Sequence, residues 1–231
     1  MIHSESRIAA ICAIVGSLLL FVGTFLHPMH ADPNDVLAAF TEYAADRLWI
    51  ISHLVQLAGV ALAVGALLFL AQEVEARNRA RWPRIAAGGA IASLAVTAAL
   101  QSVDGIALKT MVDVWAAAPA AQKETAFYAA FAVRQMEIGL GAVLSLLFGL
   151  TVTVYGIALL VDHTYPQWLG GLGIAGGVPT IVAGMVMAFT GFSGLAMAIS
   201  MPAGSLVLVW MLTLGICMWR RGRVPPEDTA G

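Results

Sequence analysis

Six long apolar stretches recur along the chain, and short polar or proline-containing stretches separate them. They cover residues 8–27, 48–72, 84–104, 132–161, 168–190 and 203–220. An α-helix rises 1.5 Å per residue, so about 20 apolar residues are enough to cross the ~30 Å hydrocarbon core of a bilayer. The pattern predicts an all-α integral membrane protein. We expect a six-transmembrane-helix bundle that forms one domain over residues 1–223, with a disordered cytoplasmic tail at 224–231.

Two of the connections carry helical patterns of their own. Asp32 and Pro33 are typical of a helix start, and apolar positions then recur at helical spacing, at Val36, Leu37, Phe40, Tyr43 and Ala44. This pattern predicts a short extracytoplasmic amphipathic helix that lies on the membrane surface or over the bundle. Pro119 predicts the start of a helix that continues into the span at 132–161. Such a helix is longer than a bilayer requires, so we expect its outer end to project.

Local helix breakers predict two further boundaries. Asp104 and Gly105 are expected to close the third span. Residues 192–202 are expected to form a weakly polar connection that ends at Pro202, so that the sixth span starts directly after this proline.

Lysine and arginine are unevenly distributed among the connections. Of the twelve in the chain, eight lie at Arg7, within 77–84 and within 220–223. The four others are Arg47, Lys109, Lys123 and Arg134. Cytoplasmic loops carry an excess of Lys and Arg, so the distribution predicts a multi-pass protein of the cell membrane with both termini in the cytoplasm. The overall pattern of apolar spans and polar connections is similar to that of multi-pass proteins of bacterial inner membranes.

Composition supports the membrane assignment and narrows the partners. The chain has 60% hydrophobic and 11% charged residues, against roughly 25% charged residues in a soluble domain. Its net charge of −2 gives no reason to expect a nucleic acid as a partner. The expected partners are the lipid bilayer and a small-molecule ligand, and an oligomer or a partner subunit is a further option. Cys12 and Cys217 lie near the predicted cytoplasmic side, where disulfides are rare, and are predicted to be inert buried thiols.

Polar residues interrupt the first four spans as pairs three residues apart. The pairs are His27 and His30, His53 and Gln56, Gln101 and Asp104, and Arg134 and Glu137. Residues three apart share one face of a helix. The predicted topology places one ionisable residue of each pair in a slab about 9 Å thick near the outer edge of the hydrocarbon, namely His27, His53, Asp104 and Glu137. Ionisable groups in an apolar helix are costly unless they pair or face a wet cavity. The pairs therefore predict an outward-facing polar pocket between the first four spans.

The first hypothesis for this pocket is that it binds or translocates a small ligand. The ligand-binding residues would be His53, Gln56, Gln101, Asp104, Arg134, Gln135 and Glu137. Arg134 would be the hub, because a guanidinium stays charged and offers five donors to nearby carboxylates. The alternative is a structural or accessory membrane subunit, in which ion pairs at the membrane edge only set the helix register.

Histidine and methionine leave a third option open. A divalent metal such as zinc would be held by His27, His30 and His53, with carboxylates nearby as further ligands. His27 and His53, at similar depth on adjacent antiparallel helices, could instead be the axial ligands of a haem b. A set of methionines near the outer face, Met29, Met197 and Met201, would suit Cu(I). A bound haem or metal ion would make the protein a haem- or metal-binding membrane oxidoreductase. The sequence therefore does not decide whether the chain is an enzyme.

Glycines in the fifth span match two motifs. Gly171, Gly173 and Gly176 have the spacing GxGxxG. A dinucleotide site also requires a preceding strand and an acidic residue about 20 positions later, and neither is found here. Gly173 and Gly177 have the spacing GxxxG, which predicts a face for close helix–helix packing.

Overall fold

The computed structural model describes residues 2–78 and 81–222, and within these ranges every regular element is helical. In chain order the elements are α1 (Ile2–Leu26), α2 (Val36–Ala45), α3 (Trp49–Asn78), α4 (Trp82–Gln101), the π-helical segment η1 (Ser102–Leu108), α5 (Lys109–Ala117), the short 3-10 turn η2 (Ala120–Gln122), α6 (Lys123–Asp162), α7 (Gln167–Thr190) and α8 (Gly194–Arg221). The tail predicted at 224–231 lies outside the described residues.

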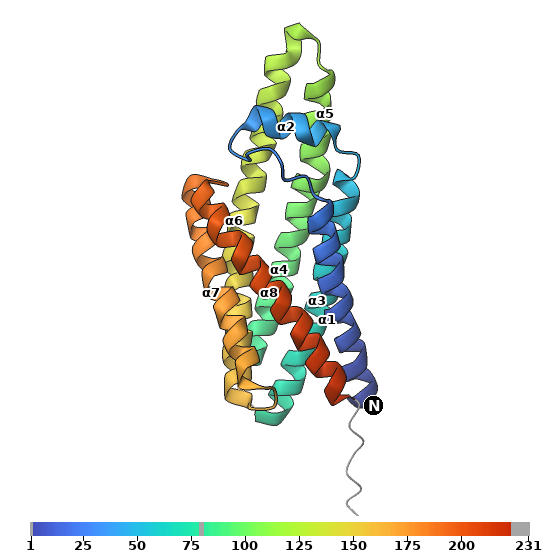
Figure 1. Cartoon of the computed structure of the whole chain (residues 1–231), viewed down its shortest axis with the longest axis vertical. Coiled ribbons are helices and arrows are strands. Elements are labelled where there is room, and N and C mark those ends of the chain that lie inside the picture. Colours follow the sequence, from blue (N-terminus) through green and yellow to red (C-terminus); the bar gives the residue numbers. More distant parts are fainter. Residues whose placement is uncertain (1, 79–80, 223–231) are drawn as a thin grey trace, which may run out of the picture.

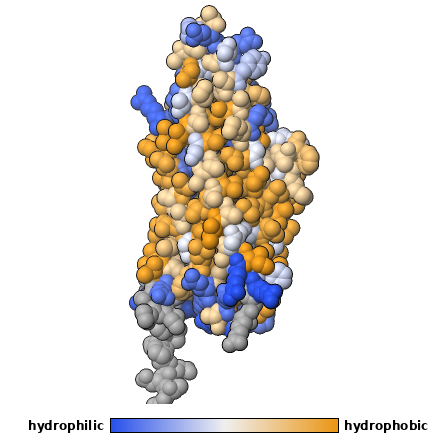
Figure 2. All heavy atoms as spheres, turned by 180° about the vertical axis from the view of Figure 1, so that it is seen from behind, coloured by the Kyte–Doolittle hydropathy of each residue, from blue (hydrophilic) through white to orange (hydrophobic). Residues whose placement is uncertain are grey.

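Six helical segments in the described ranges are long and apolar enough to cross a membrane. They are Glu5–Leu26, Trp49–Arg77, Trp82–Ala117, Ala120–Asp162, Gln167–Thr190 and Gly194–Arg221. Large apolar side chains such as Phe25 and Phe189 point outward, with 77% and 91% of their surface exposed. Apolar side chains also cover the middle of the face seen in Figure 2, while polar ones gather toward its two ends. The prediction of an all-helical chain with six apolar helices of membrane length is confirmed, and these features are compatible with a multi-pass membrane protein.

The two arginine-rich segments lie at the same end of the bundle, which is also the end where α1 begins (Figure 1). There the guanidinium of Arg221 lies 3.9 Å from the Glu73 carboxylate and 4.9 Å from the centre of the Tyr165 ring. The Tyr165 hydroxyl donates a hydrogen bond to Glu73 over 2.7 Å. Arg79 and Arg223, which belong to the same predicted clusters, lie outside the described residues. The end of α3 and the end of α8 are therefore held together by charged contacts.

The predicted end of the third span at Asp104 and Gly105 is wrong. The helix widens into η1 and continues through α5 to Ala117. A Cβ atom on Gly105 would lie 2.6 Å from the Cβ atom of His53, so this glycine serves the close approach of η1 to α3 and does not end the helix. π-Helical segments are rare and are frequently found at functional sites, and this one carries Asp104.

The predicted start of the sixth span after Pro202 is also wrong, because α8 already begins at Gly194. The Ser193 side chain accepts a hydrogen bond from the Ala196 amide at 3.2 Å and caps the helix. Pro202 lies inside α8. Proline is tolerated inside membrane-length helices, where neighbouring groups and local adjustments satisfy the freed carbonyl.

Helix α6 has 40 residues, which corresponds to a length of about 60 Å. Its first turns and α5 project beyond α2 at the end opposite the arginines (Figure 1), as the sequence predicted for this helix. Helix α2 lies across the bundle just below this projection. Its buried Phe40 packs against Trp115 and Phe127, with ring centres 5.9 and 5.7 Å away. The Lys109 ammonium donates to the carbonyls of Tyr43 and Ala44, so it caps the C-terminus of α2.

Glycines bring α6 and α7 into close contact. A Cβ atom on Gly177 would lie 2.7 Å from the Gly149 carbonyl oxygen, and one on Gly173 would lie 3.0 Å from the Trp210 ring nitrogen of α8. Both members of the predicted GxxxG pair therefore face a neighbouring helix at close range, which confirms the packing face. One turn earlier in α7, a Cβ atom on Gly170 would lie 2.6 Å from the Gly156 carbonyl oxygen.

Replacing Gly170 with alanine is expected to lower the free energy of unfolding by about 1–3 kcal/mol, because the added methyl group overpacks the α6–α7 contact. The adjacent Gly171 is a matched control, since a Cβ atom there would meet nothing within 4 Å. Gly171→Ala is expected to leave stability unchanged or to raise it by up to ~1 kcal/mol through helix propensity. Thermal unfolding of both variants in detergent measures the difference. Equal effects of the two substitutions would contradict the packing argument.

Candidate functional site

A cavity of about 310 Å³ lies next to α2, which contributes Glu42 and Tyr43 to its wall. Helix α2 lies toward the end of the bundle opposite the arginines (Figure 1). The α1–α2 connection, α2, η1, α6, the α7–α8 turn and the first turns of α8 all contribute to the wall of the cavity. The lining residues are His27, Pro28, Met29, Ala31, Pro33, Glu42, Tyr43, Asp104, Arg134, Glu137, Phe192, Met197 and Met201. The wall is thus mainly apolar, with a few ionisable groups that come from different helices.

Arg134 and Glu137 form a buried ion pair on α6, with only 3% and 6% of their side chains exposed. Arg134 Nη1 donates to both carboxylate oxygens of Glu137, over 3.1 and 2.9 Å. Its Nη2 donates to the Pro33 carbonyl at 3.3 Å, which ties α6 to the chain that leads into α2. The guanidinium also lies 5.4 Å from the ring centre of Tyr43 and 5.0 Å from that of Phe192. Arg134 therefore holds the walls of the cavity together by charge, hydrogen bonds and cation–π contacts.

His53 of α3 and Asp104 of η1 form a second polar contact. His53 Nε2 lies 3.0 Å from Asp104 Oδ2. The other ring nitrogen, Nδ1, lies 2.6 Å from the Trp49 carbonyl oxygen. A carbonyl oxygen can only accept, so Nδ1 carries the hydrogen. Asp104 Oδ1 is buried and has no hydrogen-bond partner within the described residues.

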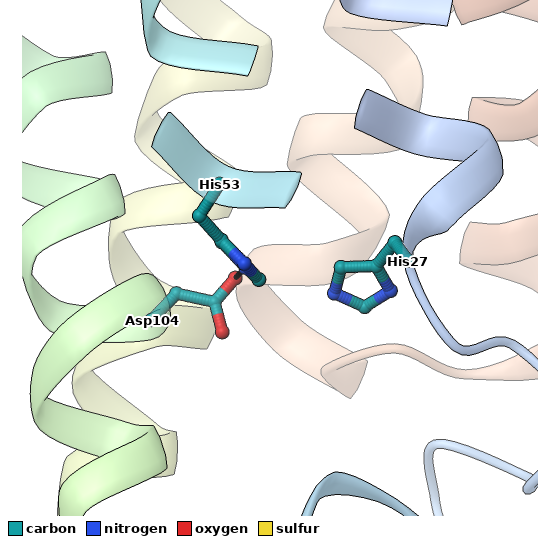
Figure 3. Close-up of side chains that lie close together, drawn as sticks. All are labelled: His27, His53 and Asp104. Atoms are coloured by element: carbon teal, nitrogen blue, oxygen red, sulfur yellow. Dashed lines mark hydrogen bonds and ion pairs between the residues drawn. The ribbon is translucent and has the colours of Figure 1, made fainter. Parts of the chain in front are cut away.

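His27, which follows the end of α1, completes a cluster with these two residues (Figure 3). One ligand atom from each of His27, His53 and Asp104 lies within 4.8 Å of the other two. We call these three residues the His–His–Asp cluster. His27 Nδ1 lies 2.8 Å from the Pro28 carbonyl oxygen, so its other nitrogen is the one turned toward the cluster. Burial lowers the pKa of His27, and the neighbouring His53 lowers it further.

Trp49 supports the cluster from the side. Its ring centre lies 4.8 Å from that of His27 and 4.8 Å from that of His53. The ring centre of Trp49 also lies 4.3 Å from that of Tyr43 in α2. Its Nε1 donates to the Asp104 carbonyl at 3.0 Å. Trp49 therefore connects the His–His–Asp cluster, helix α2 and the π-helical segment η1.

The remaining predicted site residues lie at the edge of the site or outside it. Gln101 Nε2 donates to Gln56 Oε1 at 3.1 Å, so these two residues pair with each other and do not line the cavity. Gln135 is exposed on the outer side of α6. His30 is also exposed, and its backbone amide binds the Glu42 carboxylate. The structure thus brings Asp104, not His30, to the two histidines.

Several residues of the site carried only a weak signal in the sequence. Tyr43 was recognisable only as part of the apolar face of α2. It instead lies under the Arg134 guanidinium, and burial raises its pKa to about 12. Glu42 was not singled out in the sequence, yet it lines the cavity. Phe192 lay in a segment that resembled a plain connection.

Two chemistries can be judged directly from the geometry. Ser52 Oγ lies 3.3 Å from His53 Nδ1, but it donates to the Trp49 carbonyl and is completely buried. A Ser–His–Asp mechanism therefore has no access to a substrate. The ionisable side chains of the cavity wall include three carboxylates, from Glu42, Asp104 and Glu137, against the single guanidinium of Arg134. With the carboxylates ionised, this excess of negative charge favours a cationic ligand.

Comparison of the chain with protein families, with curated proteins and with solved structures gives no match. The fold and the site therefore define a class only: within the described residues, a helical protein with six apolar helices of membrane length and a mainly apolar cavity lined by buried charges. Its function has to be argued from the geometry of that cavity.

Proposed function

We propose that this chain is a multi-pass membrane protein whose outward-facing cavity binds or translocates a small ligand. The six apolar helices would cross a bacterial inner membrane, with both termini in the cytoplasm. The arginine-rich end of the bundle would then face the cytoplasm, in agreement with the excess of positive charge on that side of membrane proteins. The cavity and helix α2 would lie at the opposite, extracytoplasmic side of the membrane.

The observation that carries this proposal is that Asp104, Arg134 and Glu137 line one cavity although they come from two different helical segments. A charged side chain at membrane depth costs at least ~2.5 kcal/mol near the helix centre. Ion pairs that only set the helix register need no open space next to them. Charges around a cavity with otherwise apolar walls are instead typical of small-molecule sites. The accessory-subunit alternative accounts for the ion pairs but not for the cavity.

The haem alternative has less support. His53 Nε2, the nitrogen that would bind the haem iron, lies 3.0 Å from Asp104 Oδ2. The ring centres of His27 and His53 are only 5.0 Å apart, at an angle of 58°. This arrangement leaves no space for a planar porphyrin between the two imidazoles.

Accessibility of the cavity from the outside tests the proposed function. Met197 lines the cavity, and Met197→Cys is made in a background with Cys12→Ala and Cys217→Ala. The new thiol is expected to react with a charged, membrane-impermeant methanethiosulfonate added to intact cells. A thiol reacts as its thiolate, which requires contact with water. Met185→Cys is the matched control, because Met185 is 49% exposed on the outer surface of α7 and would face lipid.

The expected result is that the cysteine at position 197 reacts at least ~10-fold faster than the one at position 185, since a lipid-facing thiol stays protonated. If both react equally slowly, the cavity does not open to the outside and the proposed function fails. A fast reaction only in inverted vesicles would place the cavity on the cytoplasmic side and would overturn the proposed orientation.

A further inference from the structure

We propose that the His–His–Asp cluster binds one divalent first-row transition-metal ion, with His27 Nε2, His53 Nε2 and Asp104 as the ligands. This inference rests on the proposed function, because His27 and Asp104 also line the cavity. It names the cationic ligand that the excess of carboxylates in the wall favours.

The first argument is the tautomeric state of the two imidazoles. In both rings Nδ1 lies against a backbone carbonyl oxygen, of Pro28 for His27 and of Trp49 for His53. A carbonyl cannot donate, so in each neutral ring Nδ1 holds the hydrogen and Nε2 has a free lone pair. Histidines that bind metals almost always donate their other N–H to a carbonyl, a carboxylate or water. Both rings are therefore held in the orientation and tautomer of metal ligands.

The second argument concerns the contact between His53 and Asp104. In the neutral tautomer, the lone pair of His53 Nε2 points at a carboxylate oxygen only 3.0 Å away. Two lone pairs at this distance repel each other unless a proton or a metal ion lies between them. The second oxygen, Asp104 Oδ1, is buried and has no hydrogen-bond partner within the described residues. A bound cation would satisfy both oxygens and the imidazole.

The donor set indicates the kind of ion. Two imidazole nitrogens and one carboxylate form the ligand set of many zinc sites in which a fourth position stays open. The same set suits other borderline divalent ions, whereas Ca²⁺ and Mg²⁺ prefer oxygen ligands only. The open position would face the cavity, where a water molecule or a small anion could complete the coordination.

The distances require only a small adjustment. Ligand atoms that lie ~2.1 Å from a tetrahedral ion are about 3.4 Å apart. In the cluster these atoms lie within 4.8 Å of one another, and the pair from His53 and Asp104 is already at 3.0 Å. His27 therefore has to approach by up to about 1.4 Å. It follows the last residue of α1 and belongs to a connection without regular structure, so this movement breaks no helix.

Binding of Co²⁺ alone to the full-length protein in metal-free detergent buffer tests the proposal. One equivalent is expected by elemental analysis, together with the visible absorption of tetrahedral Co²⁺, and Zn²⁺ is expected to displace it. Loss of an outer-shell partner lowers metal affinity ~10–100-fold. His27→Ala and Asp104→Asn remove direct ligands, so each is expected to lower the affinity by at least this factor. His30→Ala and His163→Ala are matched controls at exposed histidines outside the cluster and are expected to bind like the unmodified chain.

The proposal is overturned if the unmodified protein binds no Co²⁺, or if His30→Ala weakens binding as much as His27→Ala does. Size-exclusion chromatography shows which variants are folded. If Asp104→Asn is not, His27→Ala decides the outcome, because His27 lies outside the helices. A protein with an accessible cysteine at position 197 but without metal binding would keep the cavity as a ligand site. In that case His53 and Asp104 would form an ordinary proton-bridged ion pair.

Discussion

Replacing Arg134 with leucine is expected to destabilise the protein by about 3–5 kcal/mol, the range seen when one partner of a buried ion pair is removed. The substitution leaves the Glu137 carboxylate with 6% of its side chain exposed and without its two hydrogen bonds from the guanidinium. It also removes the donor to the Pro33 carbonyl and thereby frees the chain that leads into α2. Equilibrium unfolding in mixed detergent measures the loss.

Two further variants separate the ion pair from its surroundings. The double substitution Arg134→Leu with Glu137→Leu removes both charges and is expected to recover most of the stability, because apolar replacement of a whole buried pair is often neutral. Gln135→Leu is the matched control on the same helix, since Gln135 is exposed, and is expected to stay within ~0.5 kcal/mol of the unmodified protein. If Arg134→Leu were as mild as Gln135→Leu, Arg134 would not hold the cavity together.

Trp49→Ala is expected to have a similar effect, with a loss of about 3–5 kcal/mol for a large aromatic side chain in a packed core. Trp49 is 1% exposed and packs against His27, Tyr43 and His53. Its removal would separate α2 from α3 and leave the Asp104 carbonyl without the donor at 3.0 Å. The same unfolding measurement reports the loss.

A graded pair of substitutions tests this role of Trp49. Trp49→Phe keeps an aromatic ring but removes the indole N–H, so the lost hydrogen bond is expected to contribute about 1 kcal/mol to its effect. Trp168→Ala is the control, because Trp168 is 56% exposed at the arginine-rich end of α7, and it is expected to change stability by less than ~0.5 kcal/mol. A loss from Trp168→Ala as large as that from Trp49→Ala would contradict the packing argument.

The site was predictable where it depends on spacing along one helix. Arg134 and Glu137 are three residues apart, so a helix places them on one face. The structure shows the ion pair that this spacing predicts. The prediction that polar residues of several spans lie at similar depth also brought His53 and Asp104 to the same level. It could not decide which of them make contact, because depth leaves the rotation of each helix about its axis open.

Residues outside regular helices were harder to place, because their positions depend on contacts with distant parts of the chain. His27 and His30 both precede α2 and look equivalent in the sequence, yet only His27 turns inward. The structure shows why: Trp49 stacks against the His27 ring, whereas the backbone at His30 is held at the surface by Glu42. Both contacts join segments that are distant along the chain, and no local pattern reports them.

The sequence by itself determined the helical class, the six apolar helices of the described residues and the Arg134–Glu137 pair on one face of α6. These are local properties, since the length of an apolar run and the spacing of its polar residues are set within each segment. Only the tertiary structure decided that Gly105 packs closely against His53, that the third helix widens at Asp104 without ending, and that His27 joins His53 and Asp104 beside a cavity. The physical reason is that these features arise where side chains of different helices meet, and such contacts depend on helix rotation and close approach.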